Sequence, residues 1–151
     1  MHINPDNYLQ TPDGRVTTPE RNKVAWDKCY EALEAAVRQA STSTKVYLLV
    51  GPQGSGKTTW ARARSAEQSV DIYFDAILVK RSERALVLEI VRPFALGAIA
   101  VWFQTPLQSC LTRNALRPED ELVSEQAIRN VFNALEPPST VEGFEDVLIV
   151  A

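Results

Sequence analysis

The sequence is poor in the residues that most often carry metal or redox chemistry. Its 151 residues include one histidine, His2, and two cysteines, Cys29 and Cys110. The cysteines lack the spacing of a zinc site or a redox motif, so we expect both to be packing residues within helices. His2 lies at a chain end that we expect to be exposed, which leaves no histidine for catalysis or metal binding.

Basic stretches and long apolar runs are also missing. The formal net charge is −3, so the chain has no overall basic surface for non-specific binding to nucleic acid. The longest weakly polar run, FALGAIAVWF at residues 94–103, is too short to cross a bilayer, and the N-terminus lacks the pattern of a secretion signal. We therefore expect a cytoplasmic protein without a membrane partner.

The N-terminal part, residues 1–44, predicts an arm followed by a helix. Pro5, Pro12 and the turn signal DGR are typical of an extended arm, and the sequence leaves open whether this arm folds over the domain or is loose. Thr18 is the expected N-cap of the helix and Pro19 its first residue. The helix is also a surface through which two copies of the chain could associate. Its predicted packing face consists of Trp26, Tyr30, Leu33 and Val37.

The most informative stretch is VYLLVGPQGSGKTTW, residues 46–60. Its apolar start predicts a strand buried on both faces, and residues 51–58 match the pattern G-x-x-x-x-G-K-[ST]. Glycines in such a turn let backbone amides point at phosphate oxygens, and the helix that follows adds its positive end. The residues expected to bind a nucleotide are Gly51, Gln53, Gly54, Ser55, Gly56, Lys57, Thr58 and Thr59.

Within this loop Lys57 is the expected cation for the β- and γ-phosphates, and the Thr58 hydroxyl is the expected ligand of Mg²⁺. The cofactors that we expect are therefore ATP and Mg²⁺. A glycine-rich turn that merely contains a lysine is the alternative. Because no N-K-x-D motif for guanine occurs and the chain is too short for the modules of most motor ATPases, phosphotransfer is the leading class of function.

Phosphotransfer needs a carboxylate near the acceptor hydroxyl, and Asp75 is the candidate. It ends the apolar run VDIYFDA, so it should lie at the C-terminal edge of the sheet, where it could also contact Mg²⁺. The alternative is a helix cap or a loop acid. Asp71, at the other end of this strand, should be structural or solvated. Arg81 and Arg84 either contact the acceptor or simply begin a helix.

Transfer also needs cations around the moving phosphoryl group. Arg113 and Arg117 are spaced i, i+4 within residues 105–121, which places both on one face of a predicted helix that could act as a lid. The alternative is a solvated charged face on which they pair with Glu119 or Asp120.

The chain resembles the kinase domains of the polynucleotide 5′-hydroxyl kinase type within the P-loop kinase superfamily. In those domains an apolar strand precedes a Thr-Pro turn, and the lid helix carries R-N-x-x-R, as Arg113, Asn114 and Arg117 do here. A proline break and an E-G-F element before the last strand are matched at residues 137–138 and 142–144. The resemblance spans roughly residues 45–151 with the loop included, and it implies Mg²⁺-dependent transfer of the γ-phosphate of ATP to a hydroxyl.

The chain departs from that kinase pattern in one respect. Those kinases usually have an Asp on a strand soon after the loop helix and a second Asp on a later strand, whereas here only the strand that ends at Asp75 is seen. Asp75 would then serve as the base, or transfer is altered or lost. The alternative function is a nucleotide-binding regulatory or NTPase module with little or no transfer. The resemblance suggests a polynucleotide 5′-hydroxyl acceptor, and the acidic balance favours a small molecule or nucleotide.

The order of the elements predicts the fold class. Strands and helices alternate, which predicts an α/β fold of three layers with a mostly parallel sheet of about four strands and an N-terminal helix. Residues 1–44 form the arm and helix, and residues 45–151 form the P-loop kinase domain. Ser124 is the expected N-cap of a helix near the C-terminus.

Overall fold

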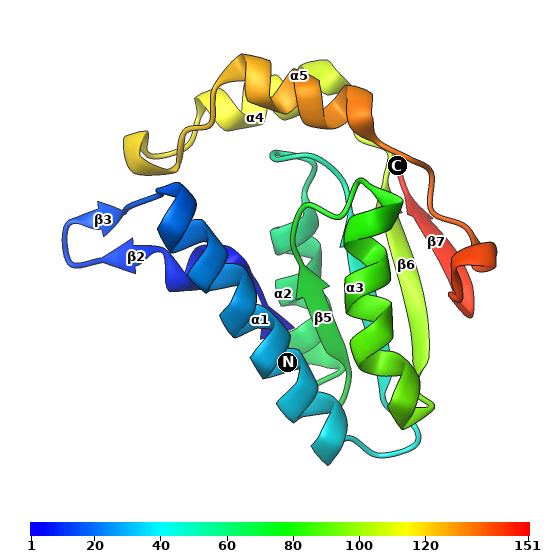
Figure 1. The fold of residues 1–151 in the computed structure, drawn as a ribbon. Helices are drawn as coiled ribbons and strands as arrows, with labels where there is room; N and C mark the ends of the chain where they lie inside the picture. Colours follow the sequence, from blue (N-terminus) through cyan, green and yellow to red (C-terminus); the bar gives the residue numbers. More distant parts are fainter.

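The computed structural model describes residues 1–151 and contains a central sheet in which all strands are parallel (Figure 1). This confirms the predicted α/β fold with a parallel sheet. The sheet has five strands rather than about four, because the first residues of the chain add an edge strand. In spatial order the strands are β1 (His2–Ile3), β5 (Ile72–Asp75), β4 (Lys45–Val50), β6 (Gly97–Phe103) and β7 (Asp146–Val150).

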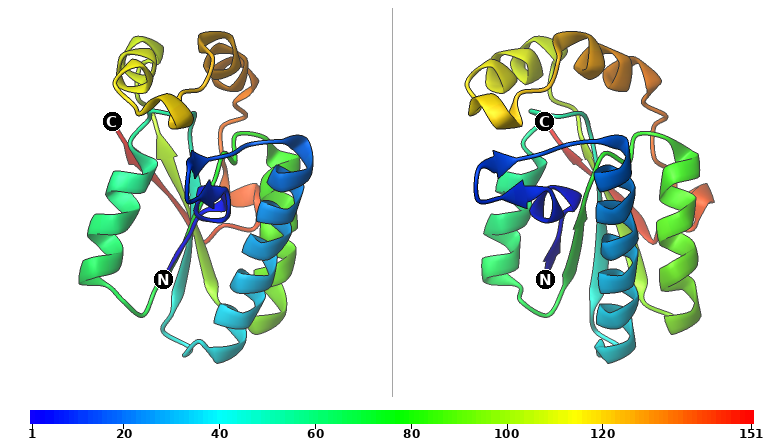
Figure 2. Two further views of the ribbon diagram at one scale, coloured as in Figure 1. Left: turned by 90° about the vertical axis from the view of Figure 1, so that its left-hand side faces the viewer. Right: turned by 60° about the vertical axis from the view of Figure 1, so that its left-hand side comes forward.

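Helices cover both faces of the sheet and complete three layers. Figure 2 shows α1 (Pro19–Gln39) and α3 (Arg81–Val91) on one face and α2 (Lys57–Glu67) on the other. Two further helices, α4 (Leu107–Ala115) and α5 (Glu125–Ala134), lie above the C-terminal ends of the strands (Figure 1). The edge above which ligands of open α/β folds bind is thus roofed by α4 and α5.

The helix starts follow the capping residues in the sequence. The Thr18 hydroxyl accepts a hydrogen bond from the Arg21 amide at 3.1 Å, and Pro19 is the first residue of α1. The Ser124 hydroxyl accepts from the Ala127 amide at 3.1 Å at the start of α5. Each cap satisfies an amide that the helix itself leaves unpaired, and both predictions are confirmed.

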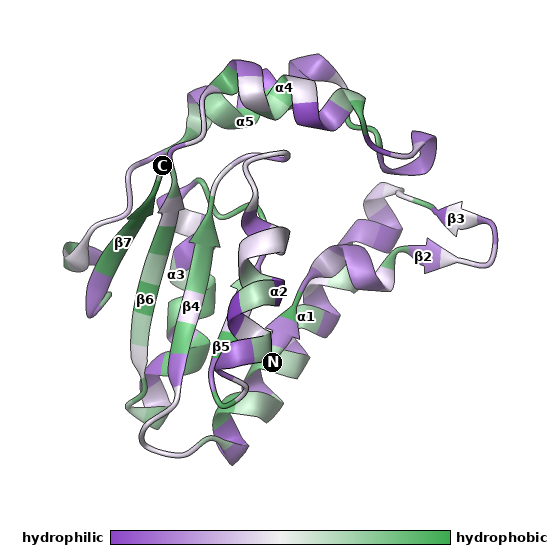
Figure 3. Ribbon diagram, turned by 180° about the vertical axis from the view of Figure 1, so that it is seen from behind, coloured by the Kyte–Doolittle hydropathy of each residue, from purple (hydrophilic) through white to green (hydrophobic).

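The main core lies between the sheet and the pair α1 and α3. Leu33 and Val37 of α1 are buried there, and Trp26 and Tyr30 pack against Phe74 with ring centroids 6.2 and 6.3 Å away. The predicted packing face of α1 is therefore confirmed. Figure 3 shows that β4 is mostly hydrophobic beyond its first residue, as expected for the central strand of a sheet that helices cover on both faces.

The two cysteines and Asp71, the residue before β5, also have structural roles. Cys29 and Cys110 are fully buried and unpaired in helices, which confirms them as packing residues. Asp71 accepts a hydrogen bond from the Lys45 amide at 2.9 Å, so it connects the starts of two neighbouring strands.

No helix of the protein has the length and apolarity that a membrane span requires.

The first eighteen residues fold over the domain, which answers the question that the sequence left open. β1 pairs with β5 in register His2 to Tyr73 and Ile3 to Phe74. A 3-10 turn at Pro5–Tyr8 follows, and a small antiparallel hairpin joins β2 (Gln10–Thr11) to β3 (Gly14–Arg15). The chain that follows β1 therefore lies beside the C-terminal end of β5.

Candidate functional site

The glycine-rich loop at residues 51–56 connects β4 to α2, as the motif predicts. Gly54 and Gly56 have φ angles of +79° and +100°, in a region that side chains rarely adopt. A Cβ atom at Gly54 would lie 2.5 Å from the carbonyl oxygen of Cys110, so this position also has no room for a side chain. The loop thus depends on glycine for both its conformation and its approach to α4.

Lys57 begins α2 and turns back into the curve of the loop. Its Nζ atom donates hydrogen bonds to the carbonyl oxygens of Gly51 at 2.8 Å and Pro52 at 3.0 Å. Burial lowers the pKa of Lys57 to about 8, while the carboxylates of Asp75 and Asp6 act in the opposite direction. The ammonium group is therefore held inside the loop at a place where an anion would stabilise its charged form.

Thr58 and Asp75, the two expected Mg²⁺ ligands, are brought together. The Thr58 hydroxyl donates a hydrogen bond to Asp75 Oδ2 at 2.7 Å. Burial alone would raise the pKa of Asp75, but the contact with His2, the charge of Lys57 and the Thr58 hydroxyl hold it below its ordinary value. Hydroxyl and carboxylate oxygens are ligands that Mg²⁺ accepts, so this pair fits a divalent cation.

Asp75 is also bound by the N-terminal segment. Its Oδ2 atom lies 2.7 Å from His2 Nε2 and accepts a hydrogen bond from Asn4 Nδ2 at 3.0 Å, and its side chain is 2% exposed. The expectation that His2 is an exposed terminal residue is wrong, because β1 carries it against β5 and its side chain is 16% exposed. Asn4 Oδ1 accepts from the Asp6 amide at 2.8 Å, so Asn4 links Asp75 to the backbone of Asp6.

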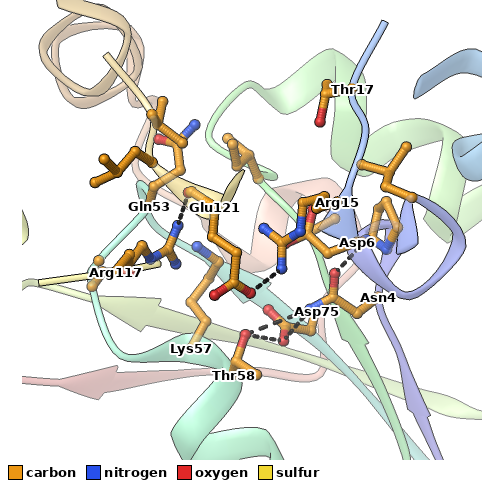
Figure 4. A pocket seen from close by; sticks show the side chains of 18 of the residues that line it. Asn4, Asp6, Arg15, Thr17, Gln53, Lys57, Thr58, Asp75, Arg117 and Glu121 are labelled. Carbon is orange, nitrogen blue, oxygen red and sulfur yellow. Dashed lines mark hydrogen bonds and ion pairs between the residues drawn. The ribbon is translucent and has the colours of Figure 1, made fainter. Parts of the chain in front are cut away.

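A cavity of about 500 Å³ lies above the loop, between the N-terminal segment and the roof (Figure 4). The nucleotide-binding residues predicted from Gln53 to Thr59 all line it, whereas Gly51 does not. Asp6 and Arg15 line the opposite side. Ser55 Oγ and Gln53 Oε1 are buried without a hydrogen-bond partner. The cavity thus brings together residues from both ends of the chain.

Arg113 and Arg117 both line this cavity, but they do not share a helical face. α4 ends at Ala115, and Pro118 prevents its continuation, so Arg117 lies beyond the helix. Arg113 Nη1 donates to the carbonyl oxygen of Gly54 at 3.2 Å, and Arg117 Nη1 lies 3.5 Å from the carbonyl oxygen of Glu121. Neither forms the ion pair with Glu119 or Asp120 that was the alternative.

Arg84 has a structural role and is removed from the acceptor candidates. Its side chain is completely buried and forms an ion pair with Glu142, with Nε 2.8 Å from Oε1. Its Nη1 atom donates to the carbonyl oxygen of Leu78 at 2.8 Å. Arg81 is exposed at the start of α3 and does not line the main cavity.

Sequence reasoning missed the contribution of the N-terminal segment. His2, Asn4, Asp6 and Arg15 precede the glycine-rich loop by more than thirty residues, and no periodicity or motif connects them to it. The one signal in the sequence was PDN at residues 5–7. These residues are typical of a turn, and they include the carboxylate of Asp6. Only the pairing of β1 with β5 puts these side chains beside Asp75.

Models of known protein families were compared with the chain and none matches it, and no curated protein matches its sequence.

Proposed function

We propose that the protein is an ATP-binding kinase of the P-loop type that transfers the γ-phosphate to a hydroxyl group of an acceptor. The observation that carries this proposal is the convergence of Lys57, Thr58 and Asp75 beneath a cavity that Arg113 and Arg117 also line. Lys57 would exchange its two carbonyl partners for phosphate oxygens, which are stronger acceptors because they are charged. The loop amides and the start of α2 would add to this site.

Thr58 and Asp75 are the residues that would hold Mg²⁺. When bound there, the ion would neutralise part of the negative charge on the phosphates. To bind it at Oδ2, Asp75 would have to give up part of its contact with His2 or Asn4, because all three contacts fall on that oxygen. Binding of metal and nucleotide is therefore linked to the N-terminal segment.

Asp6 is better placed than Asp75 to orient the acceptor hydroxyl. Asp75 is almost fully buried and is engaged by three side chains, whereas the Asp6 carboxylate is 46% exposed and lines the cavity. Asp6 also lies close enough to Lys57 to influence its pKa. A carboxylate on the far side of the phosphate site can accept a proton from a hydroxyl group as that group attacks.

The lid arginines would stabilise the charge that develops during transfer. Arg113 reaches the loop at Gly54, and Arg117 lines the cavity between the loop and the roof. Guanidinium groups held on this side of a phosphoryl group are worth more in the transition state than in the ground state, because the charge on the transferring group is spread outwards there.

The test measures label transfer from γ-labelled ATP with Mg²⁺ to a 5′-hydroxyl oligonucleotide and to a pool of nucleosides, sugars and small alcohols. Lys57→Ala should abolish ATP binding, measured by calorimetry. Asp6→Asn should lower the transfer rate by about 10²-fold or more with ATP affinity nearly intact, and Asp75→Asn should weaken the effect of Mg²⁺ on ATP affinity. Asp13→Asn, an exposed change in the same segment, is the matched control.

Unchanged ATP binding in the Lys57→Ala protein would refute the nucleotide site. An Asp6→Asn protein as active as the control would refute the role of Asp6 and return the base to Asp75.

A regulatory nucleotide-binding module is the second candidate. It is favoured by the contacts of His2 and Asn4 with Asp75, because metal binding at that carboxylate would loosen β1 and the hairpin. Such a module would bind ATP tightly without transferring phosphate to any acceptor. Nucleotide-dependent loss of hydrogen-exchange protection in residues 1–18, together with negligible turnover, would support it over the kinase.

A further inference from the structure

The cavity has two sides of opposite charge. On the side of the glycine-rich loop it is lined by Lys57, Arg113 and Arg117. On the far side, formed by the N-terminal segment and the end of the roof, it is lined by three carboxylates and one cation, which are Asp6, Asp120, Glu121 and Arg15. In the kinase proposed above, the first side would hold the triphosphate and the second would hold the acceptor.

Arg15 does not leave a free positive charge on the acceptor side. Its Nη2 atom donates to Glu121 Oε1 at 2.6 Å, and its Nη1 atom lies 3.5 Å from Asp6 Oδ2. The Arg15 amide donates a hydrogen bond to Asp120 Oδ2 at 2.7 Å. Because a backbone amide is neutral, it does not neutralise the negative charge of Asp120. Three carboxylates against one guanidinium leave these four side chains with a formal charge of −2, and Arg117, with Nη1 3.5 Å from the Glu121 carbonyl oxygen, lies at their border with the loop side.

The same contacts join the N-terminal hairpin to the segment after α4. The Arg15 side chain and amide connect β3 to the 3-10 turn Glu119–Glu121. Figure 4 shows the contact between Arg15 and Glu121. A Cβ atom at Gly14 would lie 3.0 Å from Asp120 Oδ2, so hairpin and turn are in direct contact.

We propose that the acceptor is a small alcohol that is neutral or positively charged, and that the acceptor side rejects nucleic-acid ends. This inference rests on the proposed kinase function and names the substrate class of the same site. A nucleic-acid strand needs cations along its phosphates, and on this side of the cavity its phosphates would meet carboxylates. Trp26, Ile77 and Leu122 also line the cavity, so an apolar or planar part of the acceptor can be buried beside them.

The experiment uses probes that share one 5′-hydroxyl nucleoside and differ in charge. They are thymidine, 3′-amino-3′-deoxythymidine at a pH that keeps its amine protonated, thymidine 3′-monophosphate, and a 5′-hydroxyl decathymidylate. Affinity of each is measured by calorimetry on the full chain in the presence of ADP and Mg²⁺, at low and at moderate salt. ATP affinity is measured separately in the native and Lys57→Ala proteins, so that failure of the nucleotide site is seen independently.

The native protein should bind the neutral and cationic nucleosides at least about 10-fold more tightly than the phosphorylated ones, with the difference shrinking as salt is added. The Asp120→Asn/Glu121→Gln protein should narrow this ratio by about 10-fold. Glu119→Gln removes the same kind of charge from the same turn outside the cavity, and it should leave the ratio unchanged.

Two results would overturn the assignment while ATP binding stays intact. One is binding of the decathymidylate or of thymidine 3′-monophosphate as tight as that of thymidine, with affinity that falls steeply with salt. The other is a charge preference in the double variant equal to that of Glu119→Gln. Failure of all four probes to bind would also contradict it, since the neutral and cationic probes are expected to bind.

Discussion

Replacing Arg84 with methionine should destabilise the protein strongly, although Arg84 lies outside the cavity. The side chain is 0% exposed, and Glu142, its partner, is 4% exposed. Nε and Nη2 donate to the two oxygens of Glu142 at 2.8 and 3.1 Å, and Nη1 donates to the carbonyl oxygens of Leu78 and Val79 at 2.8 and 3.1 Å. Methionine keeps the volume but leaves a buried carboxylate and two carbonyl groups without these partners.

The magnitude follows from this geometry. Removing one partner of a buried ion pair costs about 3–5 kcal/mol, because the remaining charge is neither paired nor hydrated. A domain of this size has a free energy of unfolding of about 5–15 kcal/mol, so the loss is a large part of the total. Since a change of 1 kcal/mol moves the Tm of such a domain by about 2–4 °C, the Tm should fall by roughly 6–20 °C.

The assay is urea unfolding of the native protein and four variants, followed by tryptophan fluorescence. Arg84→Met and Glu142→Leu should each be destabilised, while the double variant Arg84→Met/Glu142→Leu should lose much less than the sum of the two. Arg129→Met breaks the exposed pair with Glu125 and should cost less than about 1 kcal/mol. If Arg84→Met loses no more than Arg129→Met, or if the two single losses add, the buried pair is not what connects α3 to the segment before β7.

Four further predictions concern the site and the buried thiols. Asn4→Ala removes an amide that competes with the ion for Asp75 Oδ2, and it should strengthen Mg²⁺-dependent ATP binding by up to about 10-fold, checked by calorimetry with and without Mg²⁺. Arg113→Ala and Arg117→Ala should each lower kcat for phosphate transfer more than they lower ATP affinity, and an equal loss in both would contradict a transition-state role. Burial raises the pKa of Cys29 to about 12 and also raises that of Cys110, so a thiol reagent at pH 8 should label neither cysteine in the native protein and both in denaturant. Because the raised pKa of Cys29 favours the neutral thiol in the fold, its contribution to stability is present below pH 9 and is lost as the pH rises toward 12.

Local features were predictable because they depend on neighbouring residues. The strand, loop and helix at residues 46–60 follow from an apolar run, three glycines and the helix formers after Lys57. The caps Thr18 and Ser124 were also predictable, since a hydroxyl group and the amide that it accepts from are three residues apart. The contact between Thr58 and Asp75 was also predictable. Thr58 follows β4 and Asp75 ends β5, and parallel strands place their C-terminal ends at one edge of the sheet.

The limits of sequence reasoning are clearest at Arg84 and Arg117. Arg84 was predicted either to contact the acceptor or to begin a helix, and its partner Glu142 is fifty-eight residues away. Arg117 was predicted to lie in a helix because its spacing from Arg113 is helical, yet α4 ends at Ala115 because Pro118 cannot continue it. The spacing of residues along the chain reveals neither the ion pair of Arg84 nor the end of α4.

The sequence by itself determined the glycine-rich loop, the helix starts at Thr18 and Ser124 and the parallel α/β layering, because hydrophobic period, capping and turn chemistry act over a few residues. Only the tertiary structure decided that His2, Asn4, Asp6 and Arg15 belong to the same cavity as Lys57. The physical reason is that β1 has only two residues, too few to show a period, and it is held in place by backbone pairing with β5, a partner about seventy residues away.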